Sequence, residues 1–397
     1  MHQIKINVNQ LKIGMYVSSL DRPWTETPFL FQGFYVKEKS TIEELTKYCK
    51  YVFVDIEQGI APDTDTPAVK QDKAEEPVTF EKELPRAKQI HHKVSQVFNN
   101  VIDTIKNSGE VNVEEISKEV EVMVEGCIRN PDAYVLLSKL KNKDDYTYGH
   151  CLSSSIYAVM LGTRMGLNKT EVEELAFGHM FFDIGKLKLP NELLYKDGDY
   201  TPEEKIQVRK HVFHSIDILN TMEGVNPSAI SIAKNHHERY DGSGYPNGLK
   251  GNEIPLYARI AGIIDTYDAL TSKRLYSKQY SPHEAIHMLY NSRDKEFQKD
   301  ILEIFIQCLG AYPTGSLVEL NTGEVGIVLQ QNKISRLRPK IMLILNRKKE
   351  FNDYFPIINL LSRPTNDTGI VMEISKTLDP GSYDINPAEF YLQIKTA

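Results

Sequence analysis

Hydrophobic and polar positions near the start of the chain mostly follow the spacing of β-strands. The runs IKINV, YVSSL, FYVKE and YVFVDI are rich in β-branched and aromatic residues, whereas the stretch TIEELTKYCK has helical spacing. The pattern predicts a small α+β domain over residues 1–60.

The next segment contains few large apolar side chains. Residues 61–79 read APDTDTPAVKQDKAEEPVT, which is rich in Pro, Asp, Glu and Lys. A segment of this composition cannot bury enough apolar surface to fold by itself. We expect a linker over residues 61–88, followed by a helical connector over residues 89–144.

Apolar residues then recur with helical spacing almost without interruption through residues 145–312. Capping residues mark several helix starts in this range. Asn168 is followed three positions later by Glu171, and Thr201 and Ser281 each precede a proline and a glutamate. These signals predict a helical domain.

After Pro313 the spacing returns to that of strands. SLVEL and EVGIVLQ are separated by turn residues and predict a hairpin, and PKIMLIL predicts a further strand. The tail from Asn346 is weakly patterned. We therefore expect a β-rich C-terminal extension over residues 313–397, in a protein that is mainly α overall.

Composition narrows the functional classes. The chain has 397 residues, of which 41% are hydrophobic and 25% charged, as in ordinary soluble proteins of two or three domains. Its formal net charge of -7 argues against binding to nucleic acid polymers, which requires clustered Lys and Arg. A small anionic ligand in a local pocket is compatible with this charge.

The cysteines and the N-terminus bear on location. The four cysteines are scattered without a CxxC pair, so they predict reduced thiols rather than a disulfide framework or a zinc knuckle. The start of the chain lacks the pattern of a signal peptide, and no run reaches the roughly 18 apolar residues of a membrane span. We expect a cytoplasmic protein.

Histidine and aspartate concentrate in the predicted helical domain, within short unusual strings. These strings are FFDIGKLKLP, KHVFHS, HHERYDGSGYPNGLKGNEIP and IIDTYDALTSKRLY. A single helix histidine such as His150 is more often a hydrogen-bonded structural residue than a ligand. Imidazole nitrogens and carboxylate oxygens together hold divalent transition metals, however, and a carboxylate can bridge two ions. The joint pattern predicts a dinuclear metal centre.

In this order, the strings resemble the HD-GYP family, a branch of the HD phosphohydrolases that hydrolyses cyclic dinucleotides, chiefly cyclic di-GMP. HHERYDGSGYPNGLKGNEIPLYARI carries most of the likeness, which covers about residues 145–312. The first domain looks like the small domain that often precedes HD-GYP, and PTGSLVEL looks like the usual C-terminal extension. The resemblance implies a helical HD-superfamily bundle that cleaves cyclic di-GMP to a linear dinucleotide or GMP in bacterial second-messenger signalling.

The resemblance also implies two divalent transition-metal ions, iron or manganese. The ligands would be His150, Asp183, His211, His236, His237 and Asp265. Asp183 would bridge the ions, and Lys186 would stabilise the charge that develops on a phosphate oxygen. Tyr146 stands where members with a third ion carry Glu, so we expect two ions rather than three.

Other residues are expected around this centre. By the resemblance, Tyr245 on the glycine-rich loop and Arg274 would contact the substrate, as would Lys186. Asp241 and Asp268 would brace the ligands from behind, although a structural role is equally open for Asp268. The Tyr245 loop is also expected to meet diguanylate cyclase domains; the alternative is a plain structural turn.

The sequence departs from the family pattern at the namesake His-Asp pair, because Phe182 precedes Asp183. A phenyl ring cannot bind a metal, so one ion would keep only His150, Asp183 and Asp265. His179 lies three residues before Phe182 and could supply a substitute nitrogen from the same helix face. The alternatives are a water in that position, or simple packing of the phenyl ring.

Three functions follow from these observations. The first is a cyclic di-GMP phosphodiesterase. The second is a catalytically impaired regulator that binds a cyclic dinucleotide or a cyclase domain without cleavage, which Phe182 motivates. The third is a hydrolase of another nucleotide, such as a hybrid cyclic GMP-AMP or a nucleoside monophosphate, although the GYP loop favours cyclic dinucleotides.

Overall fold

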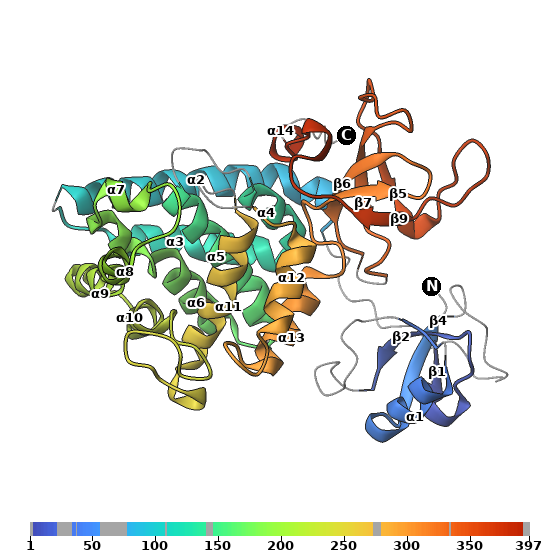
Figure 1. Ribbon diagram of the computed structural model, residues 1–397, viewed down its shortest axis with the longest axis horizontal. Coiled ribbons are helices and arrows are strands. Elements are labelled where there is room, and N and C mark those ends of the chain that lie inside the picture. Colours follow the sequence, from blue (N-terminus) through green and yellow to red (C-terminus); the bar gives the residue numbers. More distant parts are fainter. Residues whose placement is uncertain are drawn as a thin grey trace.

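The computed structural model describes residues 3–21, 34–36, 38–55, 78–107, 109–139, 146–272, 279–332 and 335–391. Along the chain it shows a small N-terminal sheet with one helix, a large helical body and a C-terminal sheet (Figure 1). The prediction of a mainly α protein with a small α+β start and a β-rich end is confirmed.

The N-terminal domain is an antiparallel sheet in the order β1-β4-β2-β3. Its strands are β1 (Gln3–Asn7), β2 (Tyr16–Leu20), β3 (Phe34–Tyr35) and β4 (Tyr51–Asp55), with the 3-10 helix η1 (Val8–Gln10) and helix α1 (Lys39–Tyr48). Val52 and Val54 of β4 and Leu45 of α1 are fully buried in a core separate from that of the helical body. The domain therefore has the hydrophobic core of an independent unit.

The helical body supplies the frame of the functional site. Its longer helices are α2 (Phe80–Lys106), α3 (Val113–Arg129), α5 (Tyr146–Arg164), α6 (Lys169–Phe181), α9 (His211–Thr221), α11 (Leu256–Thr271), α12 (Pro282–Asn291) and α13 (Lys299–Leu309). The short α4 (Pro131–Ser138) lies between α3 and α5 along the chain. Its shorter helices are η3 (Ile184–Lys188), α7 (Asn191–Leu194), α8 (Pro202–Arg209), α10 (Pro227–Asn235) and η4 (Gly251–Glu253). Helix α5 packs against both α6 and α11 in the middle of the body (Figure 1). No described helix combines the length and the apolar composition that a membrane crossing requires.

The predicted linker over residues 61–88 extends too far, because α2 begins at Phe80. Leu84 and Ala87 in this segment are fully buried, so the first turns of α2 belong to the core of the body. Their Pro- and charge-rich neighbours give the segment the composition of a linker, whereas its apolar residues keep the spacing of one helix face. Residues 56–77 lie outside the described part of the chain.

The predicted helix starts at Asn168, Thr201 and Ser281 are confirmed. Each side chain accepts a hydrogen bond from the backbone N–H of the glutamate three residues later, and that glutamate's side chain in turn accepts from the capping residue's N–H. The cap at Asn168 fixes the start of α6, and Phe182 and Asp183 directly follow the carboxyl end of this helix.

The C-terminal domain is a sheet in the order β8-β7-β6-β5-β9. Its elements are β5 (Leu317–Leu320), β6 (Val325–Gln330), β7 (Lys340–Leu345), β8 (Ile357–Asn359), η5 (Leu360–Ser362), β9 (Ile374–Thr377), η6 (Ser382–Asp384) and α14 (Ala388–Tyr391). The predicted hairpin is β5-β6, and the predicted further strand is β7.

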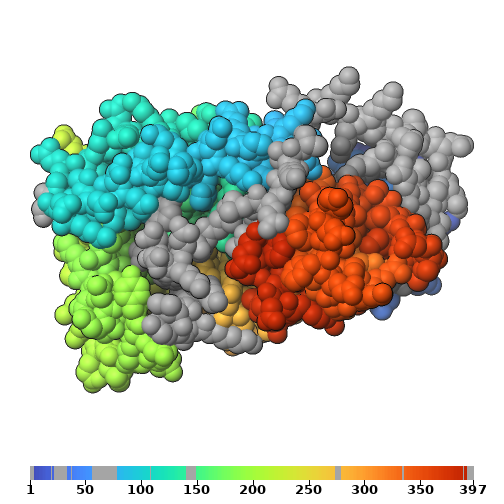
Figure 2. Space-filling view, turned by 90° about the horizontal axis from the view of Figure 1, so that it is seen from above, coloured from blue at the N-terminus to red at the C-terminus, as the bar shows by residue number. Residues whose placement is uncertain are grey.

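One face of this sheet packs on the helical body. Ile327 and Met342 belong to the same hydrophobic core as α2, and Lys340 forms an ion pair of 2.6 Å with Glu81 on that helix. Figure 2 shows the orange and red C-terminal residues beside the blue α2. Since the two parts share a core, the C-terminal sheet is a fixed part of the body.

Candidate metal centre

The structure brings all the predicted metal ligands together in the middle of the helical body. They form two groups whose ligand atoms lie within 4.8 Å of one another, and Asp183 belongs to both. The groups are Asp183, His211, His236 and His237 on one side, and His150, Asp183 and Asp265 on the other. Because these residues come from α5, the α6 end, α9, the α10 end and α11, the centre depends on how the helices pack.

Asp183 uses a different oxygen toward each group. Its Oδ1 lies 3.2 Å from His211 Nε2 and 3.6 Å from His236 Nε2. Its Oδ2 lies 3.3 Å from His150 Nε2. The side chain is fully buried, so this is the geometry of a carboxylate that can bridge two cations.

Asp265 also faces both groups. Its Oδ1 lies 3.1 Å from His150 Nε2, and its Oδ2 lies 3.7 Å from His237 Nδ1. The carboxylate enters the centre from α11, opposite the end of α6 that carries Asp183. The His150 group therefore combines one imidazole with two carboxylates.

Three of the histidines are oriented through their Nδ1 atoms. The acceptors are the Val208 carbonyl at 2.6 Å from His211, the Ala233 carbonyl at 2.9 Å from His236, and the Asp268 carboxylate at 2.7 Å from His150. An imidazole that donates from Nδ1 carries its lone pair on Nε2. All three Nε2 lone pairs are thereby directed into the centre, as in histidines that bind metals.

Asp268 lies behind His150, on the Nδ1 side of its ring. Its carboxylate is fully buried and also accepts a hydrogen bond of 3.1 Å from the Ser272 hydroxyl. Asp268 thus holds the His150 ring by one oxygen, and Ser272 fixes that oxygen in turn.

The donor set fits a divalent transition metal. The Nε2 atoms of His211 and His236 are 3.5 Å apart, and those of His211 and His237 are 3.1 Å apart. Two lone pairs that converge at these distances repel one another unless a proton or a metal cation lies between them. Nitrogen and carboxylate oxygen donors in this combination suit manganese, iron or zinc.

The electrostatics keep the carboxylates charged. Burial alone would raise the pKa of Asp183, but Lys186 and the neighbouring histidines hold it well below its usual range. Burial likewise opposes ionisation of Asp265, but the neighbouring imidazoles of His150 and His237 lower its pKa. Both groups are therefore anionic ligands at neutral pH.

Lys186 follows Asp183 by one turn of η3. Its ammonium group forms an ion pair with Asp183 Oδ2, and the side chain is 19% exposed at the edge of the centre. The ammonium thus lies beside the bridging carboxylate, and its predicted contact with a phosphate oxygen stays a prediction.

Phe182 packs against the centre as an apolar wall. The ring is fully buried, with its centroid 4.8 Å from that of His236 and 5.4 Å from that of His150. The phenyl group therefore fills the space beside the His150 group, to which it contributes no donor atom.

The structure does not bring His179 into either group of ligand atoms. Its Nδ1 donates to the Leu175 carbonyl at 2.7 Å, and its Nε2 is buried without a hydrogen-bond partner among the described residues. The ring centroid lies 5.9 Å from that of Phe182. In this geometry His179 is a buried neutral imidazole and does not replace the missing ligand.

This burial gives a testable pH dependence. Burial lowers the pKa of His179 to about 4. The folded state therefore binds fewer protons than the unfolded state between pH 4 and 6.5, so stability rises with pH through that window and is lost as pH falls. Urea unfolding in EDTA measures this effect. Between pH 6.5 and 4, we expect the free energy of unfolding of the wild type to fall by roughly 3 kcal/mol more than that of His179→Gln. Equal losses in both proteins would contradict this assignment.

Glu238 is not among the site residues predicted from the sequence, yet it fixes the glycine-rich loop by hydrogen bonds. Its buried carboxylate accepts hydrogen bonds from the backbone N–H groups of Asn247 at 2.7 Å and Leu249 at 3.0 Å. At Gly244 a Cβ would lie only 2.3 Å from the Arg239 backbone nitrogen, so the loop folds tightly back on this segment. The feature of the sequence that could have indicated this role is an acidic residue directly after His236 and His237.

Replacing Glu238 with alanine should destabilise the protein. The substitution leaves two backbone N–H groups without their charged acceptor, which costs about 2–4 kcal/mol. Urea unfolding should detect this loss. Glu253→Ala is the matched control, because Glu253 accepts from the Lys250 N–H at the exposed end of the same loop. Similar losses for both variants would contradict the role of Glu238.

Tyr245 stands beside the metal ligands. Its ring is stacked on that of His237, with centroids 4.6 Å apart and an interplanar angle of 26°. The Arg209 guanidinium lies over the same tyrosine ring, 4.5 Å from its centroid. Burial raises the pKa of Tyr245, so the phenol stays protonated at neutral pH.

The remaining predicted residues lie elsewhere. Asp241 was expected to brace the ligands, and this prediction is wrong: its carboxylate is exposed and accepts from the Ser243 N–H at 2.9 Å, which stabilises the local turn. Arg274 and the side chain of Tyr146 lie outside the described part of the structure.

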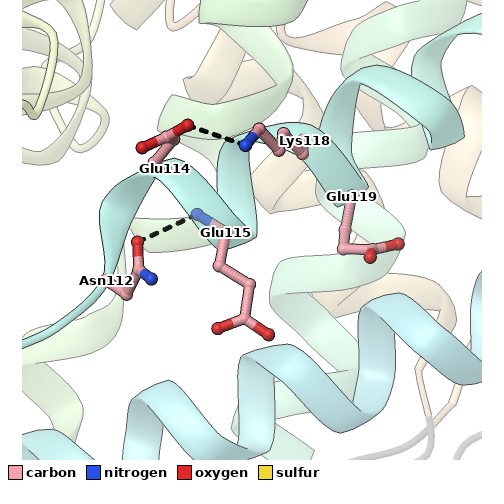
Figure 3. Close-up of a pocket in the computed structure, with 5 residues that line it drawn as sticks. All are labelled: Asn112, Glu114, Glu115, Lys118 and Glu119. Carbon is pink, nitrogen blue, oxygen red and sulfur yellow. Dashed lines mark hydrogen bonds and ion pairs between the residues drawn. The ribbon is translucent and has the colours of Figure 1, made fainter.

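A surface hollow of about 300 Å³ lies at the start of α3, lined by Asn112, Glu114, Glu115, Lys118 and Glu119 (Figure 3). Its Asn112 side chain caps the helix, and Lys118 forms an ion pair of 2.7 Å with Glu114. These exposed residues form a solvated helix start and include none of the metal ligands.

The chain matches three families of known proteins. Residues 134–301 match the HD domain, residues 3–116 match a domain of unknown function (DUF3391), and residues 317–377 match the KOW domain associated with HD domain. Along the chain, the first match (3–116) covers the N-terminal domain and α2. The second (134–301) covers most of the remaining helical body, and the third (317–377) covers the C-terminal sheet.

Individual relatives extend this comparison. A cyclic di-GMP phosphodiesterase of Pseudomonas aeruginosa is 29% identical over 359 residues, which cover 87% of this chain and 86% of the relative. The 3'3'-cGAMP-specific phosphodiesterase 2 of Vibrio cholerae is 29% identical over 233 residues, 58% of this chain and 42% of the relative. The solved structure of an HDG"Y"P protein from Bdellovibrio bacteriovorus is 14% identical and covers 76% of this chain and 98% of that one, with a TM-score of 0.48.

The helical body with its His/Asp centre defines an HD-domain protein. Within that class, the string HHERYDGSGYP beside the centre and the cyclic di-GMP phosphodiesterase from P. aeruginosa make the chain similar to the HD-GYP family.

Proposed function

We propose that the protein is a metal-dependent phosphodiesterase that hydrolyses a cyclic dinucleotide, with cyclic di-GMP as the first candidate, to a linear dinucleotide or GMP. The observation that carries this proposal is the pair of donor groups that share Asp183. The names of the relatives from P. aeruginosa and V. cholerae support the substrate class. The finer choice between cyclic di-GMP and a hybrid such as cyclic GMP-AMP depends on experiment.

Two divalent ions bound by these groups would supply Lewis acidity toward the phosphate and lower the pKa of a water. His211, His236, His237 and Asp183 would hold one ion, and His150, Asp183 and Asp265 the other. Lys186, at the partly exposed edge of the centre, would stabilise negative charge on the phosphate. Tyr245 remains a neutral hydroxyl donor beside His237.

The His150 half of the centre should bind its ion more weakly. Phe182 provides no nitrogen, so this half has three protein ligands, two of which are carboxylates that also face the other half. We infer that activity depends on the concentration of free metal, with iron or manganese as the working ion.

A second candidate function is regulation without cleavage. The wall formed by Phe182 favours it, because a centre that holds one ion can bind a phosphate and still lack the second Lewis acid. The glycine-rich loop around Tyr245 would then bind a cyclic dinucleotide or a diguanylate cyclase domain. In either case we infer a cytoplasmic protein, since the described cysteines are free and the substrate is an intracellular messenger.

The test is product analysis with purified, metal-loaded protein. Anaerobically purified protein with manganese or iron, at high enzyme concentration, should convert cyclic di-GMP to linear dinucleotide or GMP, detected by chromatography. A parallel digest of hybrid cyclic GMP-AMP determines base preference. Intact cyclic di-GMP after hours, with measurable binding, would favour the regulator, and the absence of binding would contradict both candidates.

A further inference from the structure

Arg209 occupies an unusual place at the edge of the metal centre. It is the last residue of α8, two positions before the ligand His211. Its guanidinium lies 4.5 Å from the centroid of the Tyr245 ring, and that ring stacks on His237 at 4.6 Å. The tyrosine thus connects a metal ligand to an arginine at the protein surface.

The guanidinium has free hydrogen-bonding capacity. Arg209 is exposed, and no carboxylate among the described residues lies within 4.0 Å of its nitrogens. A guanidinium has five N–H donors in a planar fork, which matches the oxygens of a phosphate. Its contact with the Tyr245 ring restricts the side chain before a ligand arrives.

The surroundings of Arg209 are positive. Lys210 follows it directly and Lys188 ends η3, and both are exposed. They lie close enough to His214 that their charges, after the effect of burial, contribute to lowering its pKa. The nearby carboxylate Asp217 partly offsets them. These lysines add positive charge near the start of α9, which begins two residues after Arg209.

The proposed substrate has a second anionic group to place. A cyclic dinucleotide contains two phosphodiesters on opposite sides of one ring, and each carries a negative charge. When one is held at the His/Asp centre, the other must lie outside it. We propose that Arg209 binds this second, uncleaved phosphate and so selects substrates with two phosphates. This inference rests on the proposed function and goes beyond the residues assigned to it above.

The inference makes Arg209 a specificity residue. Loss of a charged hydrogen bond to a phosphate costs about 1.5–3 kcal/mol, which corresponds to roughly ten- to hundredfold in affinity. The effect should appear in KM and in binding of the cyclic dinucleotide rather than in kcat, because Arg209 does not touch the reacting phosphate. A substrate with one phosphate should depend on Arg209 far less.

The test compares two substrates in one variant. For manganese-loaded Arg209→Ala, kcat/KM for cyclic di-GMP should fall at least tenfold more than kcat/KM for bis(p-nitrophenyl) phosphate, and Kd for cyclic di-GMP should rise to the same extent in equilibrium dialysis. Arg209→Lys should recover part of the loss. Lys205→Ala, an exposed change one turn earlier on α8, is the matched control and should leave both substrates unchanged.

Metal content by elemental analysis separates this role from a structural one. Equal losses for both substrates, or a loss of bound metal, would show that Arg209 supports the centre and would overturn the inference. Unchanged binding of cyclic di-GMP by Arg209→Ala would overturn it as well, while the proposed function would stand. If the wild type neither binds nor cleaves cyclic di-GMP, the proposed function itself fails and the inference falls with it.

Discussion

Asp183→Asn is expected to lower cyclic di-GMP hydrolysis by at least about a thousandfold, since metal ions contribute several kcal/mol to charge stabilisation in such reactions. Asp183 faces His211 and His236 with one oxygen and His150 with the other. An asparagine keeps one neutral oxygen and replaces the other with an NH2 group, so it loses the charge and cannot bridge two ions. Elemental analysis should show less bound metal, and chromatography should show the loss of product.

Asp103→Asn is the matched control, because Asp103 is an exposed aspartate on α2 and belongs to neither group of ligand atoms. It should keep metal content, unfolding midpoint and turnover at wild-type values. An Asp183→Asn variant that binds as much metal and turns over as fast as the wild type would contradict the bridging role.

Phe182→His is expected to strengthen metal binding in the His150 half by at least about tenfold. Mutation of a residue that only hydrogen-bonds to a metal ligand already changes metal affinity by that factor, and a new ligand should do at least as much. The phenyl ring is fully buried and contacts both His150 and His236, so an imidazole at this position enters the centre. Turnover at limiting manganese should rise with it. Metal binding by calorimetry and initial rates at graded manganese concentrations measure the two effects.

Phe182→Leu separates the new nitrogen from the loss of the ring. Leucine is apolar and smaller, so it should open space without adding a ligand, and metal affinity should not increase. If Phe182→His bound metal no better than Phe182→Leu, the phenyl ring would not be what limits the His150 half.

The ligand set was predictable because its residues lie in short, recognisable strings. The adjacent His236 and His237 and the string around Asp183 mark the site without knowledge of the fold. Their convergence was not derivable from spacing, because it depends on the packing of α5 against α6 and α11. The resemblance to a family supplied that step.

Some residue roles were predicted wrongly or not at all, for local physical reasons. Asp241 is an acidic residue beside glycines, and in the structure it stabilises its own turn rather than the ligands. Glu238 bonds to backbone groups nine and eleven residues away, which no helix or strand period indicates. The contact between Arg209 and Tyr245 joins two separate strings, so neither string predicts it alone.

The domain pattern was predictable in outline. The strands at both ends and the helix of the N-terminal domain were confirmed, but two features of packing were not visible in the sequence. The N-terminal sheet has its own core, whereas the C-terminal sheet shares the core of the helical body through residues such as Ile327 and Met342. Truncation of the C-terminal sheet would therefore expose part of the core that supports the metal centre.

The most direct test of the proposed centre is a manganese titration of metal-free protein, with bound metal and cyclic di-GMP cleavage measured on the same samples. We predict one tightly bound ion, a second and weaker ion, and product formation that follows occupancy of the second. Two bound ions without product at high enzyme concentration would contradict the proposed activity, and cleavage without bound metal would contradict the assigned centre.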